Sequence, residues 1–436
     1  MPAEREFYTL FVVDIAVIGT GYVGLSTGAC FSHLGHRVTC VDVDVDKVLA
    51  LSRGQVPIAE YGLDDLVSAG LGAGTLSFTT DLQRAVGKAQ VVFLCVPTPQ
   101  ADDGSADLSF VWTAVGDLAP HLDKGTVVVN KSTVPVGTAQ HVAEMIGRSD
   151  ISVVSNPEFL RQGTAVHDFL HPNRIVIGGH DPVAVETVAG LYEGVNAPVL
   201  RMSAESAETL KYAANSLLAT KLTFINAMAD ICEAVGADIF EVSAGIGLDP
   251  RIGRDMLNAG PGWGGSCFPK DTRALVKIAE QGGYDFALLR GVIETNDRHY
   301  ERIAEKVIAV CGGSVAGLTV AGWGLTFKAG TDDLRDSPAI KILAMLRDAG
   351  ASVRAHDPTA RGRYRAHPWI EVAPTALDAC KGADVLAVLT EWPEYGRVSP
   401  SSVRDLLSAA RVVDGRNVLD RESWREVGFE YRGVGR

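Results

Sequence analysis

A single cysteine, Cys267, closes a glycine-rich run in the stretch "GPGWGGSCFPKD", and Lys270 and Asp271 follow it closely. If a helix begins near Pro269, Cys267 precedes its N-terminus, where the helix dipole and Lys270 would favour the nucleophilic thiolate. Glycines keep side chains away, so we expect them to leave room beside the backbone for a ligand. The alternative is an ordinary structural cysteine, because the chain has seven cysteines and most free cysteines are buried.

A cation and an amide form a second pair of interest. Lys211 and Asn215 are four residues apart in the apolar segment "KYAANSLLAT", so they share one face of a helix. Directed into a cleft, they would stabilise a developing alkoxide. The alternative is a lysine whose stem covers apolar surface while its charge reaches water.

The hexapeptide "GTGYVG" places Gly19, Gly21 and Gly24 in a GxGxxG frame between an apolar strand and a helix. Asp42 ends the next strand, close to the ~20-residue spacing of dinucleotide-binding units. Such glycines allow a tight turn and a close approach of a pyrophosphate to the helix N-terminus. A carboxylate at Asp42 would bind a ribose diol and repel a 2′-phosphate, which favours NAD over NADP. The alternative is a tight turn without a ligand.

Polar residues also follow other apolar strands. Thr98 in "CVPTP" and Ser132, Thr133 and Thr138 in "KSTVPVGT" lie where a doubly wound sheet binds ligands, although turns favour the same residue types.

Basic residues occupy similar places near the C-terminus. Lys328 and Arg335 in "GLTFKAGTDDLRDSP" and Arg416 in "DGRN" suit a diphosphate or a second nucleotide. Solvated loop charges are the alternative.

The pair His167 and His171 has metal-ligand spacing, but no third ligand accompanies it, which favours a surface or capping role. We therefore predict no metal.

Alternating strands and helices position these residues and predict an α/β fold with two Rossmann-like doubly wound domains. A long helix from about residue 204, ended by Gly236 and capped by Ser203 or Ser206, would join them with a helical middle region. The predicted domains are 12–203 for NAD, 204–312 for the spine helix and the cysteine loop, and 313–436 for a diphosphate or a second nucleotide.

Bulk composition narrows the function. A net charge of -13 argues against nucleic-acid and anionic-membrane partners, and no apolar run reaches the ~20 residues of a membrane span. Irregularly spaced cysteines without a CxxC favour reduced thiols in the cytoplasm. The first dozen residues lack a basic region and a cleavage site, so we expect a lead-in and no signal peptide.

Taken together, the motifs resemble those of the UDP-glucose/GDP-mannose dehydrogenases. They run in consistent order from about Ile15 to Asn417. The motifs that carry the resemblance are "GTGYVGL", "CVPTP", "KSTVPVGT", "NPEFL", "ETLKYAANSLLATKLTFIN", "RIG", "GGSCFPKD", "GLTFKAGTDDLRDSP" and "DGRN".

The resemblance implies an enzyme that oxidises a primary alcohol to a carboxylate in two NAD-dependent steps. Cys267 would attack the aldehyde formed first, and the resulting thiohemiacetal would become a thioester that water hydrolyses. Lys211 and Asn215 would stabilise the oxyanion, Asp271 and Thr133 would position a water, and Glu158 would assist hydrolysis.

The resemblance also implies a sugar nucleotide as the ligand of 313–436, a set of binding residues, and a homodimer built on the long helix. The cofactor residues would be Gly19, Gly21, Tyr22, Val23, Gly24, Asp42, Lys47, Pro97, Thr98, Ser132, Thr133 and Arg335. The substrate residues would be Phe159, Leu160, Arg161, Lys211, Asn215, Arg251, Trp263, Gly264, Phe268, Phe327, Lys328 and Arg416, with Arg251 contributed by a partner subunit.

Two positions depart from the family pattern: Gln162 and Ala227 replace residues that are commonly Glu, so no charged role transfers to them. "KYAANSLLATK" and "GGSCFPKD" favour a glucose nucleotide. The alternatives are a GDP-mannose, UDP-N-acetylhexosamine or dTDP-glucose substrate, a catalytically silent binding protein, and a two-electron alcohol dehydrogenase, which would not need the cysteine.

Overall fold

The computed structural model describes residues 12–359 and 367–436. The chain forms two compact units, the first extending to Ala213 and the second running from Ala214 to Arg436. The expected lead-in at residues 1–11 lies outside the described residues. The three-domain division stays a prediction.

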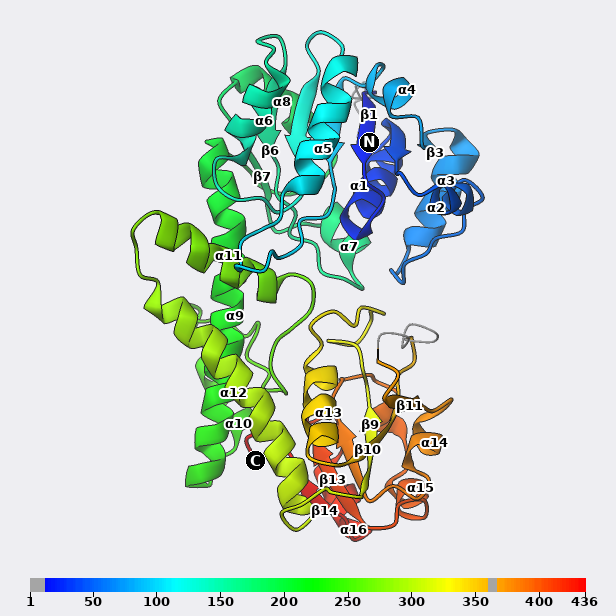
Figure 1. Cartoon of the computed structure of the whole chain (residues 1–436), viewed down its shortest axis with the longest axis vertical. Helices are drawn as coiled ribbons and strands as arrows, with labels where there is room; N and C mark the ends of the chain where they lie inside the picture. Colours follow the sequence, from blue (N-terminus) through cyan, green and yellow to red (C-terminus); the bar gives the residue numbers. More distant parts are fainter. Residues whose placement is uncertain (1–11, 360–366) are drawn as a thin grey trace, which may run out of the picture. The chain divides into compact units, whose positions relative to one another are not determined.

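The first unit is built on a mixed sheet whose strand order is β3-β2-β1-β4-β5-β6-β7-β8 (Figure 1). The order reverses between β1 and β4, which is the switch point where doubly wound sheets bind ligands. The strands are β1 (Asp14–Ile18), β2 (Arg37–Val41), β3 (Leu76–Thr79), β4 (Val91–Leu94), β5 (Val127–Asn130), β6 (Ser152–Ser155), β7 (Ile175–Gly179) and β8 (Val199–Met202).

One pair departs from the parallel arrangement expected from the sequence. Strands β6 and β7 are antiparallel, with Val154 opposite Gly179 and Ser155 opposite Gly178. Their connection contains only the six-residue helix α7 (Ala165–Leu170), and it does not carry the chain back to the start of the sheet as a crossover helix would. Among the described residues, the other strand pairs of this sheet are parallel.

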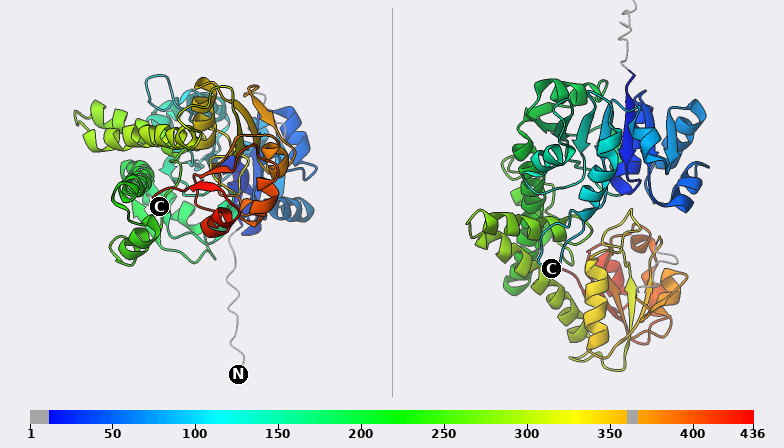
Figure 2. Two further views of the ribbon diagram at one scale, coloured as in Figure 1. Left: turned by 90° about the horizontal axis from the view of Figure 1, so that it is seen from below. Right: turned by 45° about the horizontal axis from the view of Figure 1, so that its top comes forward.

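Helices cover both faces of the sheet, because successive strand residues point to opposite sides (Figures 1 and 2). Ile15 and Val17 of β1 belong to one buried cluster, and Ala16 and Ile18 belong to the other. The first cluster packs against α1 (Tyr22–His33), α2 (Val45–Leu51), α3 (Leu63–Ala73), α7 and α8 (Pro182–Gly190). The second packs against α4 (Leu82–Val86), α5 (Ser109–Leu118), the 3₁₀ turn Ala119–His121 and α6 (Thr138–Ile146).

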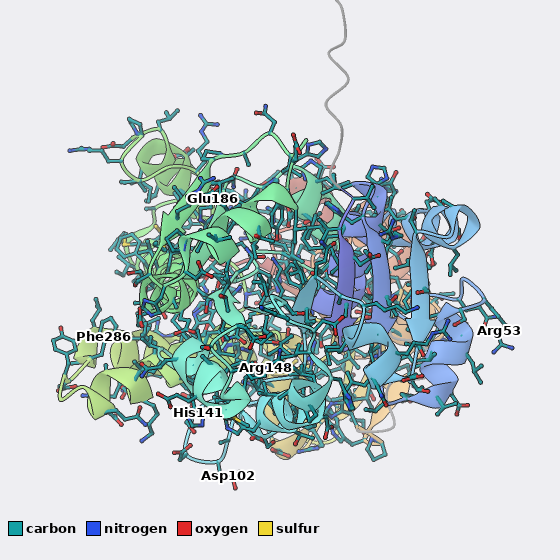
Figure 3. All side chains as sticks on the ribbon, turned by 90° about the horizontal axis from the view of Figure 1, so that it is seen from above. Arg53, Asp102, His141, Arg148, Glu186 and Phe286 are labelled. Carbon is teal, nitrogen blue, oxygen red and sulfur yellow. The ribbon has the colours of Figure 1, made fainter. Side chains whose placement is uncertain are left out.

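Some charged side chains of this unit lie at its surface. Arg53 and Asp102 are exposed and project from its edge in the view of Figure 3.

The long helix expected from the sequence is α9 (Ala204–Val235), with 32 residues. Ser203 Oγ accepts a hydrogen bond from Ser206 N at 3.2 Å, as an N-cap residue does. Gly236 follows the last turn with φ +77°, a left-handed conformation that ends the helix and favours glycine. Both predicted ends are confirmed.

The second unit combines helices with a parallel sheet ordered β11-β10-β9-β12-β13-β14. Its helices before the sheet are α10 (Ile239–Gly247), α11 (Phe268–Gln281) and α12 (Ala287–Val310). The strands are β9 (Thr319–Trp323), β10 (Ser352–His356), β11 (Ile370–Val372), β12 (Val385–Val388), β13 (Arg411–Asp414) and β14 (Glu430–Arg432). One face packs against α12 and α13 (Pro338–Asp348). The other packs against α14 (Ala376–Cys380), the turn Tyr395–Arg397, α15 (Pro400–Arg404) and α16 (Arg421–Glu426). The Rossmann-like character of both α/β parts is confirmed.

Candidate active site

The glycine turn after β1 has the geometry of a dinucleotide-binding turn. Gly19 has φ +96°, and a Cβ there would lie 2.7 Å from Cys95 O. A Cβ at Gly24 would lie 1.9 Å from Gly19 O, so only glycine lets the helix pack this close to the strand. Gly21 faces open space and is the N-cap of α1 without a side-chain cap. This uncapped helix N-terminus fits a pyrophosphate.

Asp42 stands beside this turn, as its spacing predicted. Its carboxylate accepts hydrogen bonds from Thr20 N (2.9 Å), Thr20 Oγ1 (2.5 Å) and Lys47 Nζ (2.8 Å). Burial alone would raise the pKa of Asp42, but the hydrogen bonds from Lys47 and Thr20 outweigh it and lower the pKa to about 2. The group is therefore an anionic acceptor at neutral pH, as a ribose diol requires. This pair holds Lys47 beside Asp42, and its approach to the cofactor stays a prediction.

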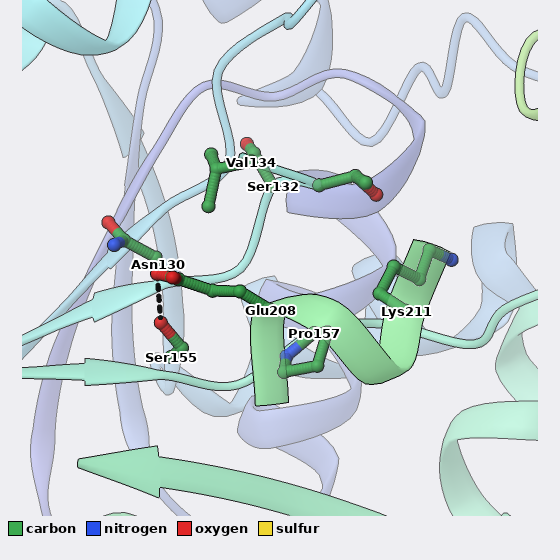
Figure 4. A pocket seen from close by; sticks show the side chains of 8 residues that line it. Asn130, Ser132, Val134, Ser155, Pro157, Glu208 and Lys211 are labelled. Carbon is green, nitrogen blue, oxygen red and sulfur yellow. Dashed lines mark hydrogen bonds between the residues drawn. The ribbon is translucent and has the colours of Figure 1, made fainter. Parts of the chain in front are cut away.

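The segment after β5 lines a small pocket (Figure 4). Ser132 Oγ donates to Val96 O at 2.6 Å, which joins the two loops that the sequence assigned to the cofactor, while Thr98 and Thr133 are mostly buried. Asn130 is buried, and its side-chain amide has no hydrogen-bond partner among the described residues. Its walls are Asn130, Ser132, Thr133, Val134, Ser155, Pro157, Glu208 and Lys211.

Lys211 forms a buried ion pair with Glu158. Its Nζ lies 2.9 Å from Glu158 Oε1 and donates to Glu158 O at 2.6 Å, and both side chains are at most 7% exposed. Burial would raise the pKa of Glu158, but the charge and hydrogen bond of Lys211 outweigh it, so the pKa is lowered. The ring of Phe159 lies 5.3 Å from Lys211 Nζ and 3.9 Å from the guanidinium of Arg174. Two predicted catalytic residues and one predicted substrate residue thus come together.

Cys267 is the N-cap residue of α11, as predicted. It is half-buried, whereas five of the seven cysteines are buried, and all seven are free thiols. Ser266 Oγ lies 3.7 Å from its Sγ. Arg335 is also an electrostatic neighbour, because Asp333 first and Cys267 to a smaller extent raise the pKa of its guanidinium. A cation and a helix N-terminus beside a thiol favour the thiolate.

Asp271 lies one turn into α11 and is 1% exposed. Asn215 Nδ2 donates to its Oδ2, and Lys270 Nζ donates to its Oδ1, both at 2.6 Å. Lys270 is therefore hydrogen-bonded to Asp271, whereas the sequence had suggested that it acts on the thiol of Cys267. The predicted contact of Asp271 and Thr133 with one water stays a prediction.

The glycine-rich loop before Cys267 is closely packed against its own unit. A Cβ at Gly262 would lie 2.5 Å from Tyr300, at Gly264 2.0 Å from Asp336 O, and at Gly265 2.8 Å from the Phe327 ring. The expectation that these glycines leave room for a ligand was therefore wrong at these three positions, because the chain itself fills that room.

Side chains from α9 and α12 anchor this loop. Trp263 is 5% exposed, and its Nε1 donates to Thr223 Oγ1 at 2.8 Å, while its backbone N donates to Asn296 Oδ1 at 2.9 Å. Gly260 N donates to Asn226 Oδ1 at 2.9 Å. The indole thus fixes the loop from inside, and its predicted place beside the substrate stays a prediction.

Lys328 and Arg416, expected near the diphosphate, and Phe327, expected beside the path of the sugar nucleotide, gather at this loop. Phe327 packs against Gly265, and Arg416 lies 3.1 Å from a Cβ position on Gly260. Arg416 Nη2 donates to Phe327 O at 2.9 Å, and its Nε forms an ion pair with Glu391 at 3.0 Å. Lys328 Nζ lies 5.9 Å from the Phe327 ring.

Other predicted residues form local pairs. Arg161 binds Asp168 at 2.6 Å, Arg335 binds Asp333 at 2.6 Å, and Arg251, 87% exposed, binds Asp249 at 2.5 Å. His167 and His171 lie at the surface with ring centroids 5.0 Å apart, and His171 is the C-cap of α7. Within residues 12–359 and 367–436 there is no group of three or more His, Cys, Asp or Glu suited to a metal ion.

Sequence reasoning missed several buried charges around the site. Glu208 accepts hydrogen bonds from Gly137 N (2.7 Å), Ala139 N (2.9 Å) and Ser155 Oγ (2.9 Å), which ties α9 to the start of α6. Its place three residues before Lys211, on the same helix face, was an available signal.

Lys131 and Glu60 gave no such signal. Lys131 is buried and donates to Asn156 Oδ1 at 2.9 Å, and Glu60 binds residues more than a hundred positions away. Contacts between residues so distant in the chain leave no local pattern.

Comparison with known proteins identifies three consecutive matches. Residues 13–196 match the NAD binding domain of the UDP-glucose/GDP-mannose dehydrogenase family, residues 205–298 its central domain, and residues 321–421 its UDP binding domain.

Individual relatives agree. A UDP-glucose 6-dehydrogenase of Rhizobium meliloti (strain 1021) is 46% identical over 97% of this chain and 100% of its own. The UDP-glucose 6-dehydrogenase TuaD of Bacillus subtilis (strain 168) is 44% identical over 97% of this chain and 93% of its own. The solved structure of a UDP-glucose dehydrogenase from Pyrobaculum islandicum superposes with a TM-score of 0.91 at 36% identity, covering 100% of both chains.

Proposed function

Because the chain belongs to the UDP-glucose/GDP-mannose dehydrogenase family, we propose that it oxidises the C6 alcohol of UDP-glucose to the carboxylate of UDP-glucuronate through a covalent Cys267 intermediate. It is an NAD-dependent oxidoreductase with a UDP-binding domain. The observation that carries the covalent route is Cys267 at the start of α11, one helical turn before the buried carboxylate of Asp271. NAD, when bound at the glycine turn, supplies the hydride acceptor.

The first step removes a hydride from C6 and the proton of its hydroxyl, which gives an aldehyde. The Cys267 thiolate then adds to the aldehyde carbon, and the oxyanion takes up a proton to give a thiohemiacetal. A second hydride and the hydroxyl proton leave, so the sulfur becomes part of a thioester. Water attacks this thioester, and the carboxylate and the thiol are released. Two hydrides leave for each alcohol oxidised.

The side chains around these atoms suit the steps. Lys211 and Asn215 would face the oxygen that becomes negative, and preorganised donors of this kind stabilise an oxyanion. Asp271, held by Asn215 and Lys270, would orient a water together with Thr133. Glu158, kept ionised by Lys211, would accept a proton from the water that attacks the thioester.

Stoichiometry tests this proposal. With purified wild-type protein we expect two NADH for each UDP-glucose consumed, with UDP-glucuronate as product, measured by absorbance and by chromatography of the nucleotides. The same assay with GDP-mannose, UDP-N-acetylglucosamine and dTDP-glucose compares the alternative substrates. One NADH per substrate, or no turnover with any of these nucleotides, contradicts the proposal.

Replacement of the nucleophile tests the covalent route. We expect Cys267→Ser to slow acid formation by about 10³-fold or more, because a serine without an activating base is a poor nucleophile. Cys311→Ser is the matched control, since Cys311 is also half-buried in the second unit, and its rate should stay within about twofold. Acid formation by Cys267→Ser at the wild-type rate would exclude the thioester.

We also propose that the protein is a homodimer built on α9. Leu217, Phe224 and Ile231 recur every seven residues along this helix and are 64%, 55% and 50% exposed. An apolar stripe of this length is typical of a helix–helix interface between subunits. The exposed Arg251 would reach the substrate site of the partner subunit.

We further propose a cytoplasmic location and three functional parts: 12–203, 204–312 and 313–436. Seven free cysteines support a reducing compartment, and cell fractionation tests it. Among the helices of the described residues, none is long and apolar enough to cross a membrane.

A further inference from the structure

Glu60 is a buried carboxylate that the reaction above does not use. It lies in the loop between α2 and α3 and is 6% exposed. Backbone N–H groups of Gly163 and Ala165 donate to its two oxygens, each at 2.7 Å. The hydroxyl of Tyr22 donates to the same oxygen as Gly163. Buried carboxylates need such donors, and here the donors come from two segments far apart in sequence.

One of the two segments belongs to the cofactor turn, and the other carries predicted substrate residues. Tyr22 is the first residue of α1 and stands within the glycine turn that receives the cofactor. Gly163 and Ala165 lie three and five residues after Leu160, in the same segment as Glu158 and Phe159, and Ala165 begins α7. Glu60 therefore joins the cofactor turn to the segment that carries predicted substrate residues.

The hydroxyl of Tyr22 also lies 3.0 Å from Arg161 O, which belongs to the second segment. Burial first, and then the hydrogen bond to Glu60 and its charge, raise the pKa of Tyr22, so the hydroxyl keeps its proton and remains a donor. A change in the position of the Tyr22 ring consequently changes a contact with both Glu60 and Arg161.

The rest of the second segment is held firmly. Asp168 Oδ2 accepts a hydrogen bond from Arg161 N at 2.9 Å, and Asp168 also pairs with the Arg161 guanidinium. Residues 161–168 therefore form a short closed turn. If Glu60 moves, the backbone of Gly163 and Ala165 moves with it. Because the hydrogen bonds of Asp168 hold this turn together, the shift is transmitted along the backbone to Arg161 and Leu160.

We propose that Glu60 is a positioning residue that couples NAD binding to sugar-nucleotide binding through the hydroxyl of Tyr22 and the N–H groups of Gly163 and Ala165. The cofactor fixes Tyr22, Tyr22 fixes Glu60, and Glu60 fixes the turn that follows the substrate residues. Each ligand then spends less binding energy on ordering when the other is present, so their affinities are linked. This inference rests on the proposed function.

Calorimetric titration measures the coupling directly. NADH and UDP-glucose do not react with each other, so both bind to the full chain without turnover. In the wild type we expect saturating NADH to tighten UDP-glucose binding about 5-fold or more. Tyr22→Phe removes only the hydroxyl, and Glu60→Gln replaces an acceptor oxygen with a donor. In both variants, the factor by which NADH tightens UDP-glucose binding should fall below about 2.

Three comparisons separate coupling from damage to the fold. Tyr61→Phe and Glu186→Gln remove the same groups from exposed positions of the same unit and should keep the wild-type factor. The Tyr22→Phe and Glu60→Gln double variant should lose no more coupling than either single variant, since both act through one contact. The melting temperatures of Tyr22→Phe and Glu60→Gln are compared with that of the wild type, so that a loss of coupling in a folded protein is distinguished from unfolding.

The proposal is overturned if the wild type shows no coupling, or if Tyr22→Phe or Glu60→Gln keeps the wild-type factor. Failure of the proposed function looks different, because the wild type would then bind no UDP-glucose. In that case the same titration is run with the sugar nucleotide that the substrate assay identifies, and the same factors decide.

Discussion

At the scale of single residues, the buried pair of Lys211 and Glu158 leads to a prediction about pH. Burial raises the pKa of Glu158, and the charge and hydrogen bond of Lys211 are the main effects that lower it. Lys211→Met removes both, so we expect the pKa of Glu158 to move from below to above its usual value of ~4.3. The wild-type pair contributes stability above that pH, and the contribution is lost as the pH falls through the lowered pKa. In Lys211→Met, the protonated Glu158 contributes stability below its usual pKa, and this contribution is lost as the pH rises through the raised pKa.

Thermal unfolding from pH 4 to pH 7 measures this difference. The gap in melting temperature between wild type and Lys211→Met should widen as the pH rises, and unfolding free energy at pH 7 should fall by about 3–5 kcal/mol. Lys221→Met, on the same helix but with an exposed contact to Ile252 O, should show a gap that does not change with pH. A constant gap for Lys211→Met would contradict the buried pair.

Residue types and spacing predicted which side chains carry the chemistry, but they did not predict which side chains those residues bind. Lys211 and Asn215 were placed on one helix correctly, but their carboxylate partners, Glu158 and Asp271, lie 53 and 56 positions away. Helical periodicity identifies neighbours within a few residues, and nothing local specifies a pairing across tens of residues.

At the scale of elements, the loop before α11 predicts a specific intolerance. In Gly264→Ala the new Cβ would lie 2.0 Å from the backbone oxygen of Asp336, which cannot rotate away. We expect a loss of about 1–3 kcal/mol in unfolding free energy and a slower second oxidation, because the displaced loop carries Cys267.

Denaturant unfolding and single-turnover assays of the same samples measure both effects. Gly291→Ala is the matched control, since Gly291 lies in α12 with nothing near its Cβ position, and alanine there should maintain or raise stability. If Gly264→Ala unfolded like the wild type, the tight packing of the loop would be refuted.

The elements themselves followed from the sequence to different degrees. Both ends of α9 and the start of α11 were predicted, because caps and glycines act locally. The antiparallel pairing of β6 and β7 was not, because strand direction depends on the path of the 156–174 connection, which has no signature in composition.

At the scale of the whole molecule, the exposed stripe of α9 predicts the state of assembly. Phe224→Asp places a charge in the middle of the proposed interface, and we expect the dimer to dissociate at micromolar concentration because an unpaired buried charge is costly. Val183→Asp puts the same charge at a position in α8 that is 74% exposed, and it should leave the mass unchanged. Light scattering after size-exclusion chromatography measures both. A dimeric Phe224→Asp protein, or a monomeric wild type, would contradict the assignment.

The order of the three family domains along the chain was predictable because each has its own motifs. The filling of the glycine loop by Tyr300, Asp336 and Phe327 was not, since glycine permits close approach without specifying what approaches.

The continuity of α9 has a consequence for insertions and deletions. Lys211 and Asn215 are separated by about one helical turn, and the boundary between the two units falls between them, after Ala213. One residue added there would rotate everything beyond it by about 100° and advance it by about 1.5 Å. The same chain therefore tolerates substitutions between these two residues far more readily than a change of length. A deletion scan along α9 should show lost activity wherever the spacing of Lys211 and Asn215 changes, even in variants that still fold.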